Sequence, residues 1–300
     1  MTTLSNVPSP GALNLDHVAH FVPDIDAASA ALGSAGFTLT PFSAQSHRLT
    51  PEGPLVPAGT GNRCVMFESG YLEFLTPTGD TPVADQLRSA IARYVGVHLI
   101  AFGTGAPDDD HARLTAAGFD PLVPVALQRP ISTPDGESTA RFTVVRVPPG
   151  RMAEGRIQFC RHHTPELVWQ PRWTRHANAV TGLASVLVCV ADPKEAARRY
   201  SAFTGLACEA HGSAWRLETA RGAVVIAGAD AVERTLGIAP PALPWIAGYV
   251  LENADFAATR AALGASGARA LGERLALTLP AALGGVMIFQ PARAGALHFV

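Results

Sequence analysis

The 300-residue sequence has few charges and no cluster of one sign. Charged residues make up 16%, and 23 basic against 25 acidic residues leave a net charge of −2. Proteins that bind nucleic acid present a basic surface that neutralises phosphates, so we expect no nucleic-acid partner. Because 48% of the residues are hydrophobic, the chain can bury a large core, which excludes the disordered class.

Several signals of location and known chemistry are also missing. No apolar run reaches the roughly 18 residues of a membrane span, and the N-terminus lacks the order of a signal peptide. We therefore expect a cytoplasmic protein without a membrane partner. The cysteines Cys64, Cys160, Cys189 and Cys208 form no CxxC pair and are interpreted as reduced core thiols. Signatures of serine hydrolases, nucleotide-binding loops and HExxH zinc proteases are absent.

One pattern of strand, helix and further strands occurs four times along the chain. The copies open near Leu15, Val97, Leu183 and Ile246, and their helices end near Gly36, Gly118, Gly205 and Gly267. Each copy closes on a strand that begins with glycine, at residues 70–75, 155–160, 222–227 and 285–290. This order predicts an α+β fold of four βαβββ modules.

The length favours two domains, each made of a pair of modules. The first domain is predicted over residues 1–164 and the second over residues 181–300. The Pro-rich segment 165–180 between them is interpreted as a linker that packs down through Trp169 and Trp173.

The segments LDHVAHFVPDIDAA and NRCVMFESGYLEFL resemble the vicinal oxygen chelate superfamily, and particularly its glyoxalase-like members. The phrase IQFCRHHTPELVW is also similar to proteins of this group. The resemblance is strong over the first two modules and fainter over the last two. It implies two glyoxalase-like domains with curved mixed sheets, each around a cleft. Since members range from glyoxalase I and extradiol dioxygenases to bleomycin-binding proteins, the fold alone does not give the function.

The resemblance implies that metal ligands lie on the first and closing strands of a module. Aligning the copies gives His17 and Glu73 in the first module and His98 and Gln158 in the second. The last two modules have only Ser185, Val225, Ala247 and Ile288 there, so the C-terminal domain is predicted to be degenerate. Imidazole and carboxylate ligands suit Fe, Mn, Ni, Co or Zn, and the metal's identity stays open.

Each of these residues also has a purely structural interpretation. His17 alone would suit a core histidine, and Glu73 alone could face solvent from a half-exposed strand. Gln158 could ligate through its amide oxygen or serve as a hydrogen-bonding group. Because an amide cannot take up a proton near neutral pH, Glu73 is the expected catalytic residue and activity on lactoylglutathione is disfavoured.

Three more residues are candidates for binding the substrate. His47 and Arg63 flank a segment with the run Gly-Thr-Gly-Asn, interpreted as a loop that approaches a ligand closely. His162 follows the closing strand of the second module and is expected on the same face as Gln158 and Cys160. Solvated or structural roles are the alternative for all three.

Two functions remain open on this evidence. The first is a divalent-metal-dependent lyase, isomerase or dioxygenase that acts on a small substrate with vicinal oxygens. The second is a metal-free module that sequesters a small molecule, as the bleomycin-binding relatives do. The C-terminal half could complete the core, cover the first cleft or supply the face of a homodimer.

Overall fold

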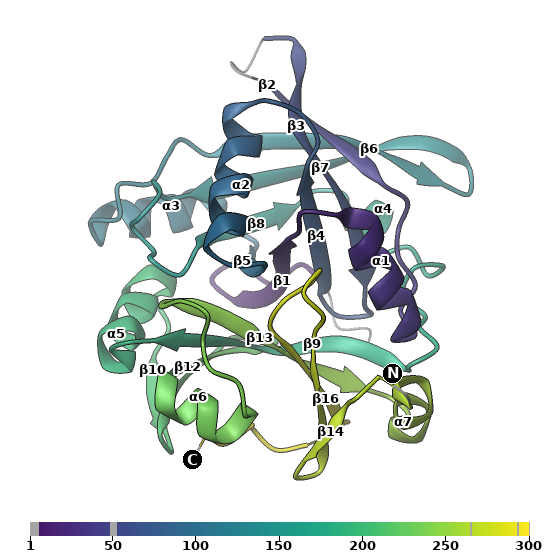
Figure 1. Cartoon of the computed structure of the whole chain (residues 1–300). Helices are drawn as coiled ribbons and strands as arrows, with labels where there is room; N and C mark the ends of the chain where they lie inside the picture. Colours follow the sequence, from purple (N-terminus) through teal and green to yellow (C-terminus); the bar gives the residue numbers. More distant parts are fainter. Residues whose placement is uncertain (1–5, 49–52, 265, 293, 300) are drawn as a thin grey trace.

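The computed structural model describes residues 6–48, 53–264, 266–292 and 294–299, with the backbone alone at residues 47, 48 and 55. Its helices and strands follow the predicted α+β order of four βαβββ modules. Figure 1 shows the first two modules in the upper half of the molecule and the last two in the lower half. No helix in the described ranges is long and apolar enough to cross a membrane.

The first two modules are alike in the order of their elements. The first consists of β1 (Leu13–Phe21), α1 (Ile25–Ser34), β2 (Ser43–Arg48), β3 (Leu55–Met66) and β4 (Tyr71–Pro77). Helix α2 (Pro82–Arg93) leads to the second, which consists of β5 (Gly96–Thr104), α3 (Pro107–Ala116), β6 (Val125–Thr133), β7 (Gly136–Arg146) and β8 (Arg156–His162). Asp24 caps α1 by accepting from the backbone N–H groups of Asp26 and Ala27, as its place before the helix predicts.

The last two modules repeat this order with shorter outer strands. After α4 (Pro165–Val168), the third consists of β9 (Val180–Val190), α5 (Pro193–Thr204), β10 (Cys208–His211), β11 (Ala214–Glu218) and β12 (Ala223–Gly228). After α6 (Ala229–Leu236), the fourth consists of β13 (Trp245–Asn253), α7 (Phe256–Leu263), β14 (Arg269–Leu271), β15 (Arg274–Thr278) and β16 (Val286–Pro291). The four predicted closing strands are β4, β8, β12 and β16.

The opening strands hold the modules together. β1 pairs antiparallel with β5, and β9 pairs antiparallel with β13. The two halves join where Ile246 of β13 pairs with Val97 of β5, so all the described strands belong to one mixed sheet. The predicted domain limits at residues 164 and 181 stay a prediction.

The segment around the Gly-Thr-Gly-Asn run is not a loop. Residues 59–62 lie inside β3, between β2 and β4. The prediction fails because these glycines leave room for neighbouring side chains. A Cβ on Gly61 would overlap the ring of Phe42, and one on Gly59 would overlap Thr81. His47, predicted in the same loop, lies in β2, and its side chain is outside the described residues.

Each opening strand carries at least one extra residue that bulges out of the pairing. Between β1 and β5 the extra residues are Asp16 and His98, and between β9 and β13 they include Ala184 and Ala247. A glycine ahead of each closing strand lies against the carbonyl of the bulged residue. An added Cβ would lie 2.8 Å from the Asp16 oxygen at Gly70, 2.4 Å from the His98 oxygen at Gly155, 3.3 Å from the Ala184 oxygen at Gly222 and 2.8 Å from the Ala247 oxygen at Gly285. The four bulges are therefore equivalent positions.

Candidate functional site

One face of the N-terminal sheet, here called the inner face, carries most of the predicted site. Cross-strand pairing places Tyr71 and Glu73 of β4 beside His17 and Ala19 of β1. On the other side of His17, Ala101 of β5 is followed by Gln158 of β8. Side chains from β3 and β4 pack against side chains from β6 and β7. The sheet is therefore curved, with the inner face on its concave side.

His17 is held in one orientation by its chain neighbour. Its Nδ1 lies 2.7 Å from Oδ2 of Asp16, and its ring stacks on Tyr71 with 4.3 Å between centroids. The side chain is 5% exposed. A carboxylate that accepts from one ring nitrogen leaves the other nitrogen basic, which is the usual arrangement of a metal-ligating histidine.

Glu73 lies on the inner face rather than on an outer, solvated face. Its cross-strand partner is Cys64, which is buried. Oε1 of Glu73 accepts a hydrogen bond of 2.5 Å from the amide of Asn62. The side chain is half-buried, and its charge raises the pKa of Arg146 and Arg156 on the other strands of this face, against the larger effect of burial.

Gln158 is buried and linked to an arginine. Its Oε1 accepts a hydrogen bond of 3.2 Å from Nε of Arg146. Burial lowers the pKa of Arg146, and burial together with Arg146 lowers the pKa of Arg156 to about 10. Neither half-buried guanidinium has an ion-pair partner within the described part of the chain. The charge of Glu73 opposes this lowering of both pKa values, but Glu73 forms no close ion pair with either arginine, so this end of the inner face is suited to an anion.

His98 does not occupy the position that corresponds to His17. The bulges make Asp16 the counterpart of His98, and His17 the counterpart of Leu99. The alignment of the copies is wrong by one residue here, because nothing in the sequence marks which residue of each strand bulges. His98 donates from Nε2 to the Tyr94 carbonyl at 2.8 Å and stacks on Tyr94 and Phe21. The structure does not bring it to His17, and its role as a ligand stays a prediction.

Sequence reasoning missed a buried cluster beside His17. The cluster consists of Asp16, Cys160 and His162, whose ligand atoms all lie within 4.8 Å of one another. Among the residues that the structure describes, no other group of three or more His, Cys, Asp or Glu residues meets this distance. Oδ2 of Asp16 lies 3.0 Å from Nε2 of His162, which lies 3.8 Å from Sγ of Cys160. Strand alternation correctly placed His162 and Cys160 on one face, but nothing in the sequence indicated Asp16, 146 residues away.

Burial and charge act in opposite directions on this cluster. Burial would raise the pKa of Asp16, but His162 and His17 hold it well below its ordinary value. Burial would lower the pKa of His162, but Asp16 and Cys160 raise it to about 10. The cluster therefore favours a positive charge next to the Asp16 carboxylate.

The remaining predicted residues lie elsewhere. Arg63 lies on the face of β3 opposite to Asn62 and Cys64, where its cross-strand partner is the core residue Phe74. Its Nη1 donates to the Thr40 carbonyl at 3.4 Å. His20 lies on the opposite face of β1 from His17, as alternation predicts, and contacts Tyr249 of the C-terminal half.

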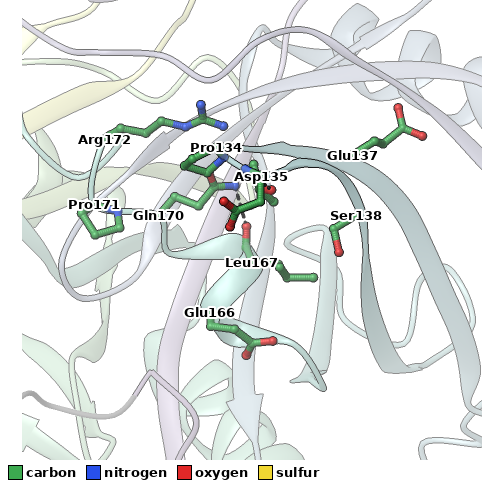
Figure 2. Close-up of a pocket in the computed structure, with 10 residues that line it drawn as sticks. Pro134, Asp135, Glu137, Ser138, Glu166, Leu167, Gln170, Pro171 and Arg172 are labelled. Atoms are coloured by element: carbon green, nitrogen blue, oxygen red, sulfur yellow. Dashed lines mark hydrogen bonds between the residues drawn. The ribbon is translucent and has the colours of Figure 1, made fainter.

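A separate surface pocket of about 640 Å³ lies between the β6–β7 turn and α4. Figure 2 shows Asp135, Glu137, Glu166 and Arg172 around it. None of the predicted site residues lines this pocket, and its mixed charges show no single preference. Most of the predicted site residues lie on the inner face instead.

Comparisons with known proteins agree with this architecture. Residues 15–204, more than half of the chain, match the family model described as a glyoxalase-like domain. No curated protein matches the chain. A hypothetical protein from Staphylococcus aureus aligns with a TM-score of 0.65 at 11% identity, covering 93% of this chain and 99% of its own.

Two enzymes have similar structures. A mutant of 4-hydroxymandelate synthase from Streptomyces coelicolor aligns with a TM-score of 0.58 at 15% identity, covering 97% of this chain and 95% of its own. A Mn(II)-bound glyoxalase from Novosphingobium aromaticivorans aligns with a TM-score of 0.53 at 10% identity, covering 97% and 84%. The chain belongs to the glyoxalase-like domain family.

Proposed function

We propose that the protein is a divalent-metal-dependent enzyme of the lyase, isomerase or dioxygenase type, acting on a small substrate with vicinal oxygens at the inner face. The observation that carries the proposal is His17, whose Nδ1 donates to the buried carboxylate of Asp16. That arrangement prepares Nε2 for a metal. The likeness to a Mn(II)-bound glyoxalase supports the same chemistry.

The donors on the inner face fit a divalent ion. His17 offers an oriented imidazole, Glu73 offers a carboxylate held by Asn62, and Gln158 offers an amide oxygen. When bound, such a metal supplies Lewis-acid stabilisation of developing negative charge on substrate oxygens. The small side chains of Ala19 and Ala101 lie between these donors.

The chain's own groups have separate roles in this proposal. The Glu73 carboxylate is the group that can take up a substrate proton, and Asn62 keeps it in place. Gln158 cannot exchange a proton and serves as a fixed donor. Arg146 and Arg156 bind an anionic group of the substrate, because neither forms a close ion pair with a described residue and a guanidinium pairs strongly with a carboxylate.

The metal is tested with Mn²⁺, a hard ion that prefers oxygen and imidazole over thiolate. Titration of the untagged, chelator-treated protein, followed by the electron paramagnetic resonance of free Mn²⁺, should give one bound equivalent. His17→Ala and Glu73→Gln should weaken binding by more than about 100-fold, which exceeds the usual effect of losing an outer-shell partner. A wild-type protein that takes up no Mn²⁺, Fe²⁺, Ni²⁺, Co²⁺ or Zn²⁺ would contradict the enzyme and favour the sequestering module.

His98→Ala serves as the comparison variant in the same titration. If His98 ligates the metal, as the sequence alignment predicts, this variant should bind as poorly as His17→Ala. If His98 is not a ligand, as the strand register indicates, Mn²⁺ binding should stay within a few-fold of the wild type. In that case the ring only contacts Tyr94 and Phe21.

Oxalate, a small dianion with vicinal oxygens, probes the arginines. In the presence of Mn²⁺, calorimetry should show that Arg156→Met weakens oxalate binding by at least about tenfold, since a charge-assisted hydrogen bond contributes about 1.5–3 kcal/mol. Arg88→Met, which removes an exposed guanidinium paired with Asp85, should leave oxalate binding unchanged. Equal oxalate affinity in Arg156→Met and the wild type would contradict the proposal that Arg156 binds an anionic group of the substrate.

A further inference from the structure

A second set of donors lies on the inner face, on the other side of His17 from Glu73. Glu73 is adjacent to Ala19, toward the C-terminal end of β1. Cys160 is adjacent to Gly103, which pairs with Asn14 toward the N-terminal end of β1. The two places are therefore separated along the strand, and His17 lies between them.

We propose that Asp16, Cys160 and His162 form a metal site of their own, suited to Zn²⁺. Carboxylate, thiolate and imidazole are the three ligand types that zinc uses in proteins. With Zn–S and Zn–N distances of about 2.3 and 2.0 Å, tetrahedral geometry separates sulfur from nitrogen by about 3.5 Å. Sγ of Cys160 lies 3.8 Å from Nε2 of His162, and Oδ2 of Asp16 lies 3.0 Å from the same nitrogen.

The backbone around the cluster leaves space for it. A Cβ on Gly103 would lie 3.2 Å from Oδ1 of Asp16, so the absent side chain lets the carboxylate extend over β5 toward Cys160. Gly70 in turn fixes the carbonyl of Asp16 at the bulge. Any larger residue at position 103 would crowd the carboxylate away from Cys160.

Two polar atoms of the cluster have no hydrogen-bond partner among the described residues. These atoms are Oδ1 of Asp16 and Nδ1 of His162, and both are buried. A buried polar atom without a partner costs about 1–3 kcal/mol. A cation bound to Nε2 of His162 would replace the hydrogen bond from that nitrogen to Asp16, and the unpartnered Oδ1 of Asp16 can bind the same ion.

The site differs in chemistry from the one in the proposed function. Its thiolate favours borderline and soft ions, while the His17–Glu73 set has no sulfur. Asp16 also accepts from His17, so an ion at this site would stabilise the carboxylate that orients His17. The inference stands whether or not the inner face is catalytic.

Cobalt distinguishes the two sites, because only a thiolate ligand produces a sulfur-to-cobalt charge-transfer band in the near ultraviolet. Titrating the reduced, chelator-treated full chain with Co²⁺ should produce this band, and Zn²⁺ should abolish it by displacement. Cys160→Ser should remove the band, and Asp16→Asn and His162→Gln should weaken Co²⁺ binding. Cys208→Ser, which changes a half-buried thiol in β10, and Glu73→Gln should both leave the band in place.

The inference is overturned if saturating Co²⁺ gives the wild type no thiolate band, or if the band persists in Cys160→Ser. Far-ultraviolet circular dichroism of each variant checks the fold, and Cys160→Ser changes one atom only. Loss of Mn²⁺ binding in Glu73→Gln together with a retained cobalt–thiolate band would support both sites. Retained Mn²⁺ binding in that variant would count against the proposed function alone.

Discussion

Arg199→Met is expected to lower the free energy of unfolding by about 3–5 kcal/mol, the usual cost of leaving a buried charge without its partner. Nη1 and Nη2 of Arg199 donate to the two oxygens of Glu154 at 2.7 and 2.8 Å. The Glu154 side chain is fully buried and that of Arg199 is 19% exposed. The pair joins the segment before β8 to helix α5, so it connects the N-terminal and C-terminal halves.

Urea unfolding of three variants tests this interpretation. Arg88→Met breaks an exposed pair and should cost about 0–1 kcal/mol. The double variant Arg199→Met with Glu154→Met should recover most of the lost stability, because it removes the uncompensated charge. An Arg199→Met protein no less stable than Arg88→Met would show that the ion pair does not stabilise the contact between the halves.

The repeated features of this fold were predictable from the sequence because each depends on local chemistry. Glycines mark the start of the closing strands, and Asp24 marks the start of α1. Alternation placed His17 and His20 on opposite faces, and the structure confirms it. The closing-strand glycine repeats in all four modules, so the comparison of copies strengthened that signal.

The position of the site depended on contacts that no local pattern carries. β1 bulges at Asp16 and β5 bulges at His98, so His17 corresponds to Leu99 rather than to His98. In the sequence, Asp16 shows no sign of a functional role. Its role depends on β8, which brings His162 within hydrogen-bond distance of it in the folded protein. Arg146 and Arg156 likewise become candidates only because folding buries them near each other and near Glu73.

Acid is expected to weaken the contact between the halves through His20. This side chain is fully buried; its Nδ1 lies 2.9 Å from the Leu283 carbonyl, and its Nε2 lies 3.0 Å from the Tyr249 hydroxyl. Burial, and to a lesser extent His98, lower its pKa from 6.5 to about 4, despite the opposing effect of the Leu283 carbonyl. The unfolded chain therefore binds a proton at a higher pH than the folded protein does.

The sign of the pH dependence follows from that difference. The stability contributed by neutral His20 is fully present above pH 6.5 and is lost as the pH falls toward about 4. The loss amounts to about 3 kcal/mol, since each unit of pKa difference corresponds to about 1.4 kcal/mol. Urea unfolding at pH 7.5 and pH 4.5 should show a smaller difference in His20→Gln than in the wild type. His111→Gln, which removes a half-exposed imidazole from α3, should keep the wild-type dependence. If His20→Gln keeps it as well, the acid sensitivity belongs to other groups, and protonation of His20 does not control the junction between β1 and the C-terminal half.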